Sequence, residues 1–202
     1  MENEKEQKEE IVKTPIPEKK ESLWQSIWEF VRFAIIAVII VIPIRVFIAQ
    51  PFIVSGSSMV PTFQDGQYLV IDEISYRLGN IKRDDVVVFH YPKDTTKFFI
   101  KRIIGLPGEI VDIKGSAVTI TNKEHPDGFV LGQPFVKNES SDVLHFELKD
   151  DEYFVMGDNR SQSSDSRYWG AVPKDLMVGR ALIRLLPVNK INIFPGNYQQ
   201  AE

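Results

Sequence analysis

The chain of 202 residues is long enough for one domain and an appendage. It contains no cysteine, which excludes disulfides, a Cys-ligated zinc site and a cysteine nucleophile. The net charge is −4, with acidic and basic residues mixed along the sequence. It therefore lacks the concentrated basic face of a nucleic-acid-binding protein, and no nucleic-acid partner is expected. Because the histidines are scattered, we also expect no metal and no cofactor.

The N-terminal residues, 1–22, are dominated by Glu and Lys and contain almost no apolar side chains. Such a segment cannot bury enough surface to offset its ordering entropy, so we predict a disordered, charged tail. Ser22, followed by Gln25 three residues later, fits the start of a helix.

An apolar segment follows over residues 23–50. Its charge-free centre, residues 33–44, has 12 residues, whereas a membrane-spanning helix needs roughly 20. The flanking Arg32 and Arg45 can extend towards lipid headgroups, and tryptophans at the start of the segment suit a membrane interface. The sequence therefore predicts a transmembrane anchor helix over residues 23–50.

Two alternatives to this anchor are a buried core helix and a cleaved signal peptide. A core helix of so small a protein should not be apolar on every face. A cleavage site should show a small-x-small pattern, which residues 46–50 lack. Lysines before the segment place the N-terminus inside, although Arg45 and further basic residues beyond it make this charge asymmetry weak.

Beyond Pro51, short runs rich in Val, Ile and Phe alternate with turn residues. This spacing favours a mainly β domain over residues 51–202, an antiparallel sandwich or barrel. A more polar stretch at about 114–149 predicts a small inserted β lobe. Candidate strands occupy residues 67–73, 85–91, 97–104, 109–113, 117–121, 152–156 and 177–185.

A polar turn, Ser-Gly-Ser-Ser-Met-Val-Pro-Thr at residues 55–62, separates two apolar runs. Serine, glycine and proline favour a turn here. A turn that presents a hydroxyl group beside free backbone N–H groups suits an acyl-transfer nucleophile. Taken alone, the stretch favours an ordinary Ser-rich loop over a nucleophile turn.

The base for such a nucleophile could be histidine or lysine. His90 lies in a strand pattern and His125 and His145 in the polar insert, none of them in surroundings typical of catalysis. A lysine can serve if its pKa falls from ~10.4 to about 7–8. Lys101 lies in an apolar run and, on a strand, points to the opposite face from Arg102. One of these two bases should face inward, unless the strand is a solvated edge.

A third polar stretch, residues 157–170, is dense in side chains that form hydrogen bonds. Asp158 or Asp165 could pair there with Arg160 or Arg167, and charge-assisted pairs can brace a loop that has no core of its own. We therefore predict a folded loop.

These three stretches together resemble the conserved boxes of the bacterial type I signal peptidases (leader peptidases), the membrane-anchored Ser/Lys endopeptidases of the S26 type that remove signal peptides from exported proteins. The resemblance implies that Ser58 is the nucleophile, that Lys101 is the general base and that Ser163 contacts this lysine. It further implies structural roles near the site for Asp158, Arg160, Asp165 and Arg167, and contacts with substrate for Met59 and Pro61.

The chain departs from some members of this family at Gly56, where they carry a serine that donates to the oxyanion hole. The oxyanion should then depend chiefly on backbone N–H groups, beginning with that of Ser58. The resemblance implies a single-pass protein of the cell (plasma or inner) membrane, with a cytoplasmic N-terminus and an extracytoplasmic catalytic domain. Its expected partners are the signal peptides of exported preproteins and the lipid bilayer.

Two other functions would make different demands on the chain. A membrane-tethered β-module that only binds partners would show no proteolysis. A self-cleaving Ser/Lys repressor of the related fold would need an N-terminal DNA-binding domain, where this chain has a charged tail and an apolar segment.

Overall fold

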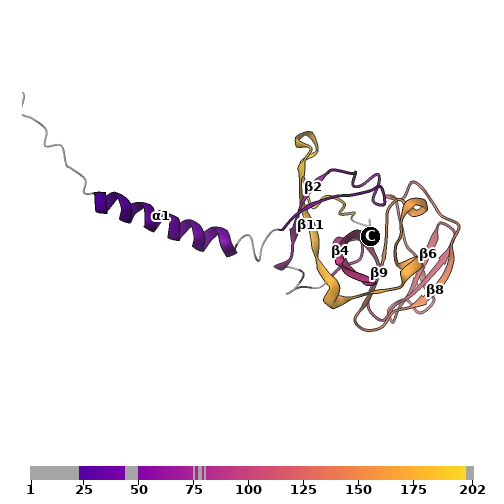
Figure 1. Ribbon diagram of the computed structural model, residues 1–202. Coiled ribbons are helices and arrows are strands. Elements are labelled where there is room, and N and C mark those ends of the chain that lie inside the picture. Colours follow the sequence, from indigo (N-terminus) through magenta and orange to yellow (C-terminus); the bar gives the residue numbers. More distant parts are fainter. Residues whose placement is uncertain (1–22, 44–49, 75, 77–78, 80, 199–202) are drawn as a thin grey trace, which may run out of the picture. The chain divides into compact units, whose positions relative to one another are not determined.

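The computed structural model describes residues 23–43, 50–74, 76, 79 and 81–198 (Figure 1). The predicted tail, residues 1–22, lies outside the described residues. The chain divides into two compact units, Met1–Val41 and Ile42–Glu202, and each is described by itself.

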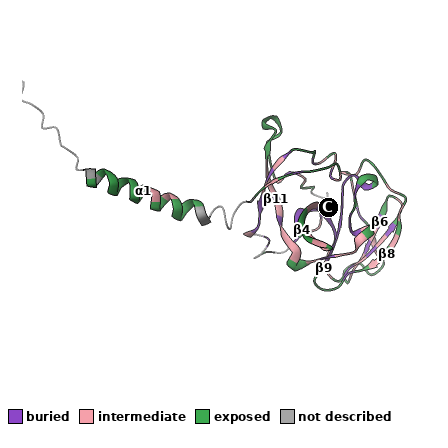
Figure 2. Ribbon diagram, in the orientation of Figure 1, coloured by how far each residue is buried: buried purple, intermediate pink, exposed green. Residues whose placement is uncertain are grey.

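Helix α1 has 21 residues and spans Leu23–Pro43, and all but its last two residues belong to the first unit. Most of its described side chains are exposed, among them Trp24 and Trp28 (Figure 2). Within the described part of the chain, no helix is both long and apolar enough to cross a membrane. The predicted anchor helix over 23–50 is wrong at its C-terminal end, because Gln50 already begins a strand and pairs with Ile71.

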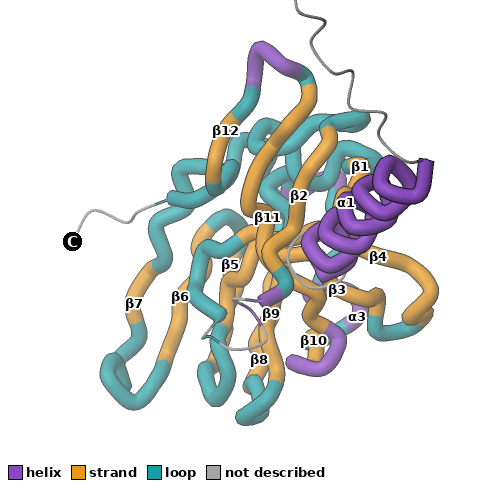
Figure 3. Tube along the Cα trace, turned by 90° about the vertical axis from the view of Figure 1, so that its left-hand side faces the viewer, coloured by secondary structure: helices purple, strands orange, loops and turns teal. Residues whose placement is uncertain are grey.

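The second unit is mainly β, as predicted (Figures 1 and 3). Its strands are β1 (Gln50–Ile53), β2 (Tyr68–Asp72), β3 (Val86–Tyr91), β4 (Asp94–Gly105), β5 (Ile110–Lys114), β6 (Ala117–Thr121), β7 (Phe129–Val130), β8 (Val143–Glu147), β9 (Glu152–Met156), β10 (Val172–Pro173), β11 (Met177–Leu186) and β12 (Asn192–Ile193). Its short helices are η2 (Arg160–Gln162), α3 (Ser166–Trp169), η3 (Lys174–Leu176) and η4 (Val188–Lys190).

The strands form two sheets, and every pairing among the named strands is antiparallel. The large sheet has the order β1-β2-β11-β3-β4-β9-β10, with β12 added beside β11. The small sheet has the order β7-β6-β5-β8. Strand β5 therefore belongs to the small lobe, which begins before the predicted boundary near residue 114.

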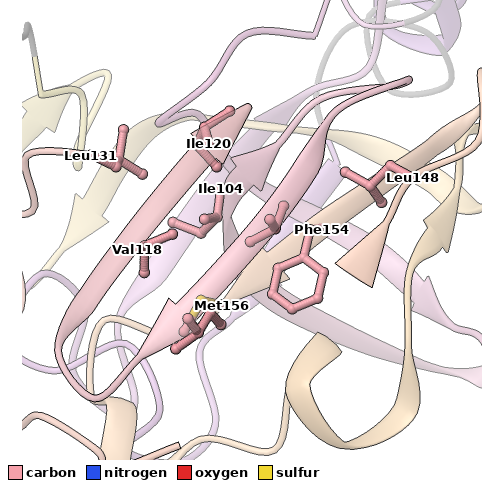
Figure 4. Close-up of a cluster of buried hydrophobic side chains, with 9 residues drawn as sticks. Ile104, Val118, Ile120, Leu131, Leu148, Phe154 and Met156 are labelled. Carbon is pink, nitrogen blue, oxygen red and sulfur yellow. The ribbon is translucent and has the colours of Figure 1, made fainter. Parts of the chain in front are cut away.

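One apolar cluster joins the two sheets (Figure 4). Ile104 and Phe154 come from the large sheet, and Val118 and Ile120 come from the small sheet. The sheets approach closely at Gly105, where an added Cβ would lie 2.7 Å from side-chain atoms of two neighbouring residues. The small lobe thus packs against β4, which carries Lys101, and against β9, which precedes the polar loop at residues 157–170.

A second apolar cluster lies on the large sheet and reaches into the Ser-rich turn. Val54 and Met59, on either side of the turn's serines, are 4% and 1% exposed and pack with Phe63, Leu69 and other buried side chains. Two buried apolar anchors therefore fix the ends of a turn whose serines stay at the surface or only half-buried.

Candidate active site

The Ser-rich turn presents Ser58 half-buried between its apolar anchors. Gly56 has φ +90°, a backbone conformation that glycine adopts without strain. Its N–H donates to the Asp65 carboxylate at 2.7 Å. A glycine at this position therefore allows the sharp turn, but it offers no side-chain donor to a substrate.

Lys101 reaches this turn from β4. Its Nζ donates to the Ser58 hydroxyl at 2.8 Å and to the Ile100 carbonyl at 2.9 Å. Only 5% of Lys101 is exposed. Burial lowers the pKa of this amine to about 8, while Asp165 and Asp158 oppose the shift. About a tenth of the amine is therefore neutral at pH 7 and able to accept a proton from Ser58.

Arg102, the next residue on β4, is also buried, with 1% exposed. Its guanidinium binds Asp158 through two hydrogen bonds of 2.8 and 2.7 Å and donates to the carbonyls of Asp84 and Gly196. Because β4 lies between β3 and β9, the alternative of an edge strand is wrong. The sequence pattern predicted one inward base, whereas both bases are buried, on opposite faces.

The loop after β9 is folded through charge-assisted hydrogen bonds. The Asp165 carboxylate accepts from the Gly157 N–H at 3.0 Å and from Arg167 at 2.8 Å. Arg167 also binds Asp142 of the small lobe. Arg160 donates to the Gly157 carbonyl at 3.0 Å and to Gln133. Of the predicted pairings, Asp165 with Arg167 is present.

Asp158 pairs with Arg102 of β4, a partner that the sequence alone did not indicate. The Thr62 hydroxyl also donates to Asp158, so this carboxylate links the Ser-rich turn to the strand that carries Lys101. Strand alternation places Arg102 on the face opposite to Lys101, but no pattern in the sequence identifies which carboxylate lies there.

Ser163 lies beside the nucleophile. Its side chain is 5% exposed, and its hydroxyl has no hydrogen-bond partner in the structure. A Cβ added to Gly157 would lie 2.5 Å from the Ser58 carbonyl oxygen and 2.6 Å from the Ser163 Cβ. Ser163 and the Ser58 backbone thus both pack against Gly157. The predicted contact of Ser163 with Lys101 is not present as a hydrogen bond.

An open groove of about 480 Å³ lies over Ser58 and Lys101. A smaller pocket of about 90 Å³ shares Ser55, Phe98, Phe99 and Ile100 with it, and the other residues that line this pocket are apolar. Pro61 is exposed, whereas Met59 is buried in the core. The predicted contacts of these two residues with substrate stay predictions.

The histidines take part in contacts elsewhere. The His90 ring contacts the Thr95 carbonyl and the His145 ring contacts Asp112, each at 2.7 Å. In the described ranges, no group of three His, Asp or Glu side chains is placed to hold a metal ion. The side chain that forms a hydrogen bond with the Ser58 hydroxyl is that of Lys101.

Comparison with known proteins identifies the family of this chain. Residues 27–186 match the family described as signal peptidase, peptidase S26. The chain is similar to a "Probable signal peptidase I-2" of Synechocystis sp., with 38% identity over 90% of this chain and 84% of that protein. It is also similar to a "Signal peptidase IB" of Staphylococcus aureus, with 31% identity over 86% of this chain and 97% of that protein.

A crystal structure of a signal peptidase I from Enterococcus faecalis aligns with 50% of this chain and 96% of its own, at 27% identity and a TM-score of 0.42. The assignment rests on the sequence matches, which cover most of the chain. This chain belongs to the signal peptidase family, peptidase S26, and is a serine peptidase.

Proposed function

We propose that this enzyme is a membrane-bound endopeptidase that removes N-terminal signal peptides from exported preproteins, with Ser58 as nucleophile and Lys101 as base. The observation that carries the proposal is the 2.8 Å contact between Lys101 Nζ and Ser58 Oγ. A buried lysine with a pKa of about 8 has a usable neutral fraction near physiological pH.

In the acylation step, neutral Lys101 takes the proton of the Ser58 hydroxyl. The Oγ atom forms a bond to the scissile carbonyl carbon, and the carbonyl oxygen becomes an oxyanion. When this intermediate collapses, the C–N bond breaks and the leaving amine takes the proton from the Lys101 ammonium. The signal peptide is left as an ester on Ser58.

In the deacylation step, water attacks the ester carbon and gives a proton to Lys101. The bond from carbon to Oγ breaks, and the proton passes to Ser58. The same lysine serves in both steps because its desolvation disfavours the charged form, and each step returns it to the neutral one.

The oxyanion is bound by backbone N–H groups, beginning with that of Ser58, because Gly56 supplies no hydroxyl. Ser163 is positioned by burial beside Ser58 and Gly157. Its free hydroxyl can turn to Lys101 when the lysine charge changes, which would orient the amine during proton transfer. Asp165 and Arg167 support this arrangement by bracing the loop that holds Ser163.

The groove over the dyad suits an extended peptide segment, and the adjoining apolar pocket of about 90 Å³ suits a small side chain. We therefore place a small residue of the signal peptide before the bond that is cut. Exposed Phe98 lines both spaces.

The proposal is tested by cleavage of a model preprotein in detergent. The wild-type enzyme should release the signal peptide, and Ser58→Ala and Lys101→Ala should each lose the activity. Ser116→Ala, which removes an exposed serine of the small lobe, is the matched control and should cleave normally. Unchanged cleavage by Ser58→Ala would refute the proposal and favour a β-module that only binds partners.

Attachment to the membrane is proposed for the apolar segment that contains α1. Its support is the run of exposed apolar side chains on that helix, including Trp28, Phe33 and Ile39. The full chain should remain in the membrane pellet after extraction with alkaline carbonate, whereas a chain that begins at residue 50 should not. Release of the full chain would contradict the anchor. Protease protection in sealed vesicles tests the cytoplasmic position of the N-terminus and the extracytoplasmic position of the catalytic domain.

A further inference from the structure

One buried residue, Asn159, donates hydrogen bonds to the backbone on both sides of the nucleophile, one from its backbone N–H and one from its side-chain amide. Its N–H donates to the Ser58 carbonyl at 3.0 Å, and its side-chain Nδ2 donates to the Ser57 carbonyl at 3.1 Å. Asn159 is 3% exposed. The two peptide groups flanking the Ser58 Cα are thus both held by one residue of the loop after β9.

Asn159 lies at the N-cap position of a short helix, but its side chain does not cap that helix. Asn159 precedes helix η2, where asparagine commonly accepts hydrogen bonds from the first N–H groups of a helix. Here the side chain makes no such bond. Its amide group reaches across to the Ser-rich turn instead.

The hydrogen bond to the Ser57 carbonyl fixes the direction of a neighbouring donor. In a trans peptide group the carbonyl oxygen and the amide hydrogen lie in one plane and point in opposite directions. The only cis bonds among the described residues precede Pro61 and Pro187, so the group that joins Ser57 to Ser58 is trans. When Asn159 holds the Ser57 oxygen on one side, the Ser58 N–H must point to the other.

The Asn159 amide is itself oriented by the small lobe. Asn138 Nδ2 donates to Asn159 Oδ1 at 3.1 Å, and the two residues form an isolated backbone bridge. With Oδ1 committed to this bond, the NH2 group must face the Ser-rich turn. It also donates to Gln162 Oε1 at 3.2 Å, which accepts the Ser57 hydroxyl at 2.9 Å.

We propose that Asn159 is a positioning residue that aims the Ser58 N–H at the oxyanion, and that Asn138 of the small lobe fixes the orientation of the Asn159 amide. The inference rests on the proposed function, because it assumes an oxyanion at Ser58. With Gly56 in place of a side-chain donor, the direction of this backbone donor carries more of the stabilisation. The small lobe thereby contributes to catalysis without touching the substrate.

The test compares kinetics and transition-state binding in Asn159→Ala and Asn138→Ala. Loss of one oxyanion donor lowers kcat by about 10²–10³-fold. A misdirected donor should therefore lower kcat of Asn159→Ala by about 10- to 100-fold, with KM unchanged. Asn138→Ala should show a smaller loss in the same direction. The apparent pKa of the pH–rate profile should stay at the wild-type value, because Lys101 is untouched.

A peptide aldehyde provides the readout that separates positioning from general damage. Its carbonyl carbon bonds to Ser58 Oγ, and its oxygen takes the place of the oxyanion. Its affinity for Asn159→Ala should fall by the same factor as kcat/KM, while an uncleavable peptide should bind as it does to the wild type. Asn122→Ala is the matched control, since this small-lobe amide donates to Glu109 and lies outside the site.

The outcomes separate the two proposals. Cleavage by Ser58→Ala would overturn the proposed function and the positioning role with it. An inactive Ser58→Ala beside a fully active Asn159→Ala would overturn the positioning role alone. A loss that appears in KM or in the apparent pKa, with unchanged aldehyde affinity, would also overturn it. If Asn159→Ala does not fold, the exposed Asn138 carries the test, and an unchanged kcat of Asn138→Ala would count against the proposal.

Discussion

The two faces of β4 carry adjacent buried bases in opposite surroundings. Arg102 has a carboxylate partner, Asp158, in a two-bond pair, and its guanidinium lies 3.9 Å from the centre of the Phe135 ring. The acceptors that Lys101 contacts in the described part of the chain are neutral, the Ser58 hydroxyl and the Ile100 carbonyl. Burial is similar on both sides, so the partners distinguish the two bases.

One strand thus carries a paired guanidinium on one face and, on the other, a buried amine whose pKa is lowered to about 8. A buried guanidinium keeps its charge, and a two-bond carboxylate pair compensates it. A buried ammonium without a carboxylate in contact is destabilised relative to the neutral amine, and it releases its proton more readily. Lysine suits the second position because its pKa can fall into the working range.

The largest expected effect is on activity and comes from the Lys101 face. Lys101→Met should lower kcat/KM by about 10³-fold or more, because Lys101 is the basic side chain that contacts Ser58 among the described residues. Lys101→Arg should be equally inactive, since a guanidinium stays protonated. Preprotein cleavage measures both. Substantial activity in Lys101→Arg would show that a neutral base is not required.

On the Arg102 face the corresponding effect is on stability. Arg102→Met should lower the free energy of unfolding by about 3–5 kcal/mol, because Asp158 is left as a buried charge without its partner. Urea unfolding of the two variants measures the contrast, and Lys101→Met should be no less stable than the wild type at pH 7. An Arg102→Met variant as stable as the wild type would show that the pair of Arg102 with Asp158 does not stabilise the fold.

The third prediction concerns the pH dependence of activity, which depends on the Lys101 face of the strand. The kcat/KM value should fall about tenfold per pH unit below the Lys101 pKa of about 8 and level off above it. Cleavage rates between pH 5.5 and 9.5 measure this. A plateau that extends to pH 6 would show that the base has another identity.

The lowered pKa of Lys101 also predicts how the free energy of unfolding changes with pH. The Lys101 pKa is about 8 in the folded state and 10.5 in the unfolded state. Between these values the unfolded chain binds more protons, so the free energy of unfolding rises with pH. Relative to Lys101→Met, the wild type should gain roughly 3 kcal/mol between pH 8 and 10.5. No relative change would place the folded pKa near its unfolded value.

The sequence predicted the pairing of Ser58 with Lys101 better than it predicted the contacts that hold these two residues in place. Ser58 and Lys101 lie in local patterns, a polar turn and an apolar strand, and local patterns are readable along one chain. The partners of Arg102 and Asn159 are far away in sequence, and the choice among several carboxylates or carbonyls depends on packing. The boundary at Gln50 was missed because an apolar run fits a helix and a buried strand equally well.

The smallest expected effect comes from a third base on β4. Lys97 pairs with Asp94 at 2.8 Å, but its side chain is 64% exposed, and the hydrogen bond that it donates to this carboxylate raises the pKa of the lysine. Because solvent screens an exposed pair, Lys97→Ala should leave the melting temperature unchanged in a thermal unfolding scan. The matched comparison is Arg102→Met, which removes a pair of similar length from a buried position. A large loss in Lys97→Ala would mean that pairing alone, and not burial, sets the contribution of a base on this strand.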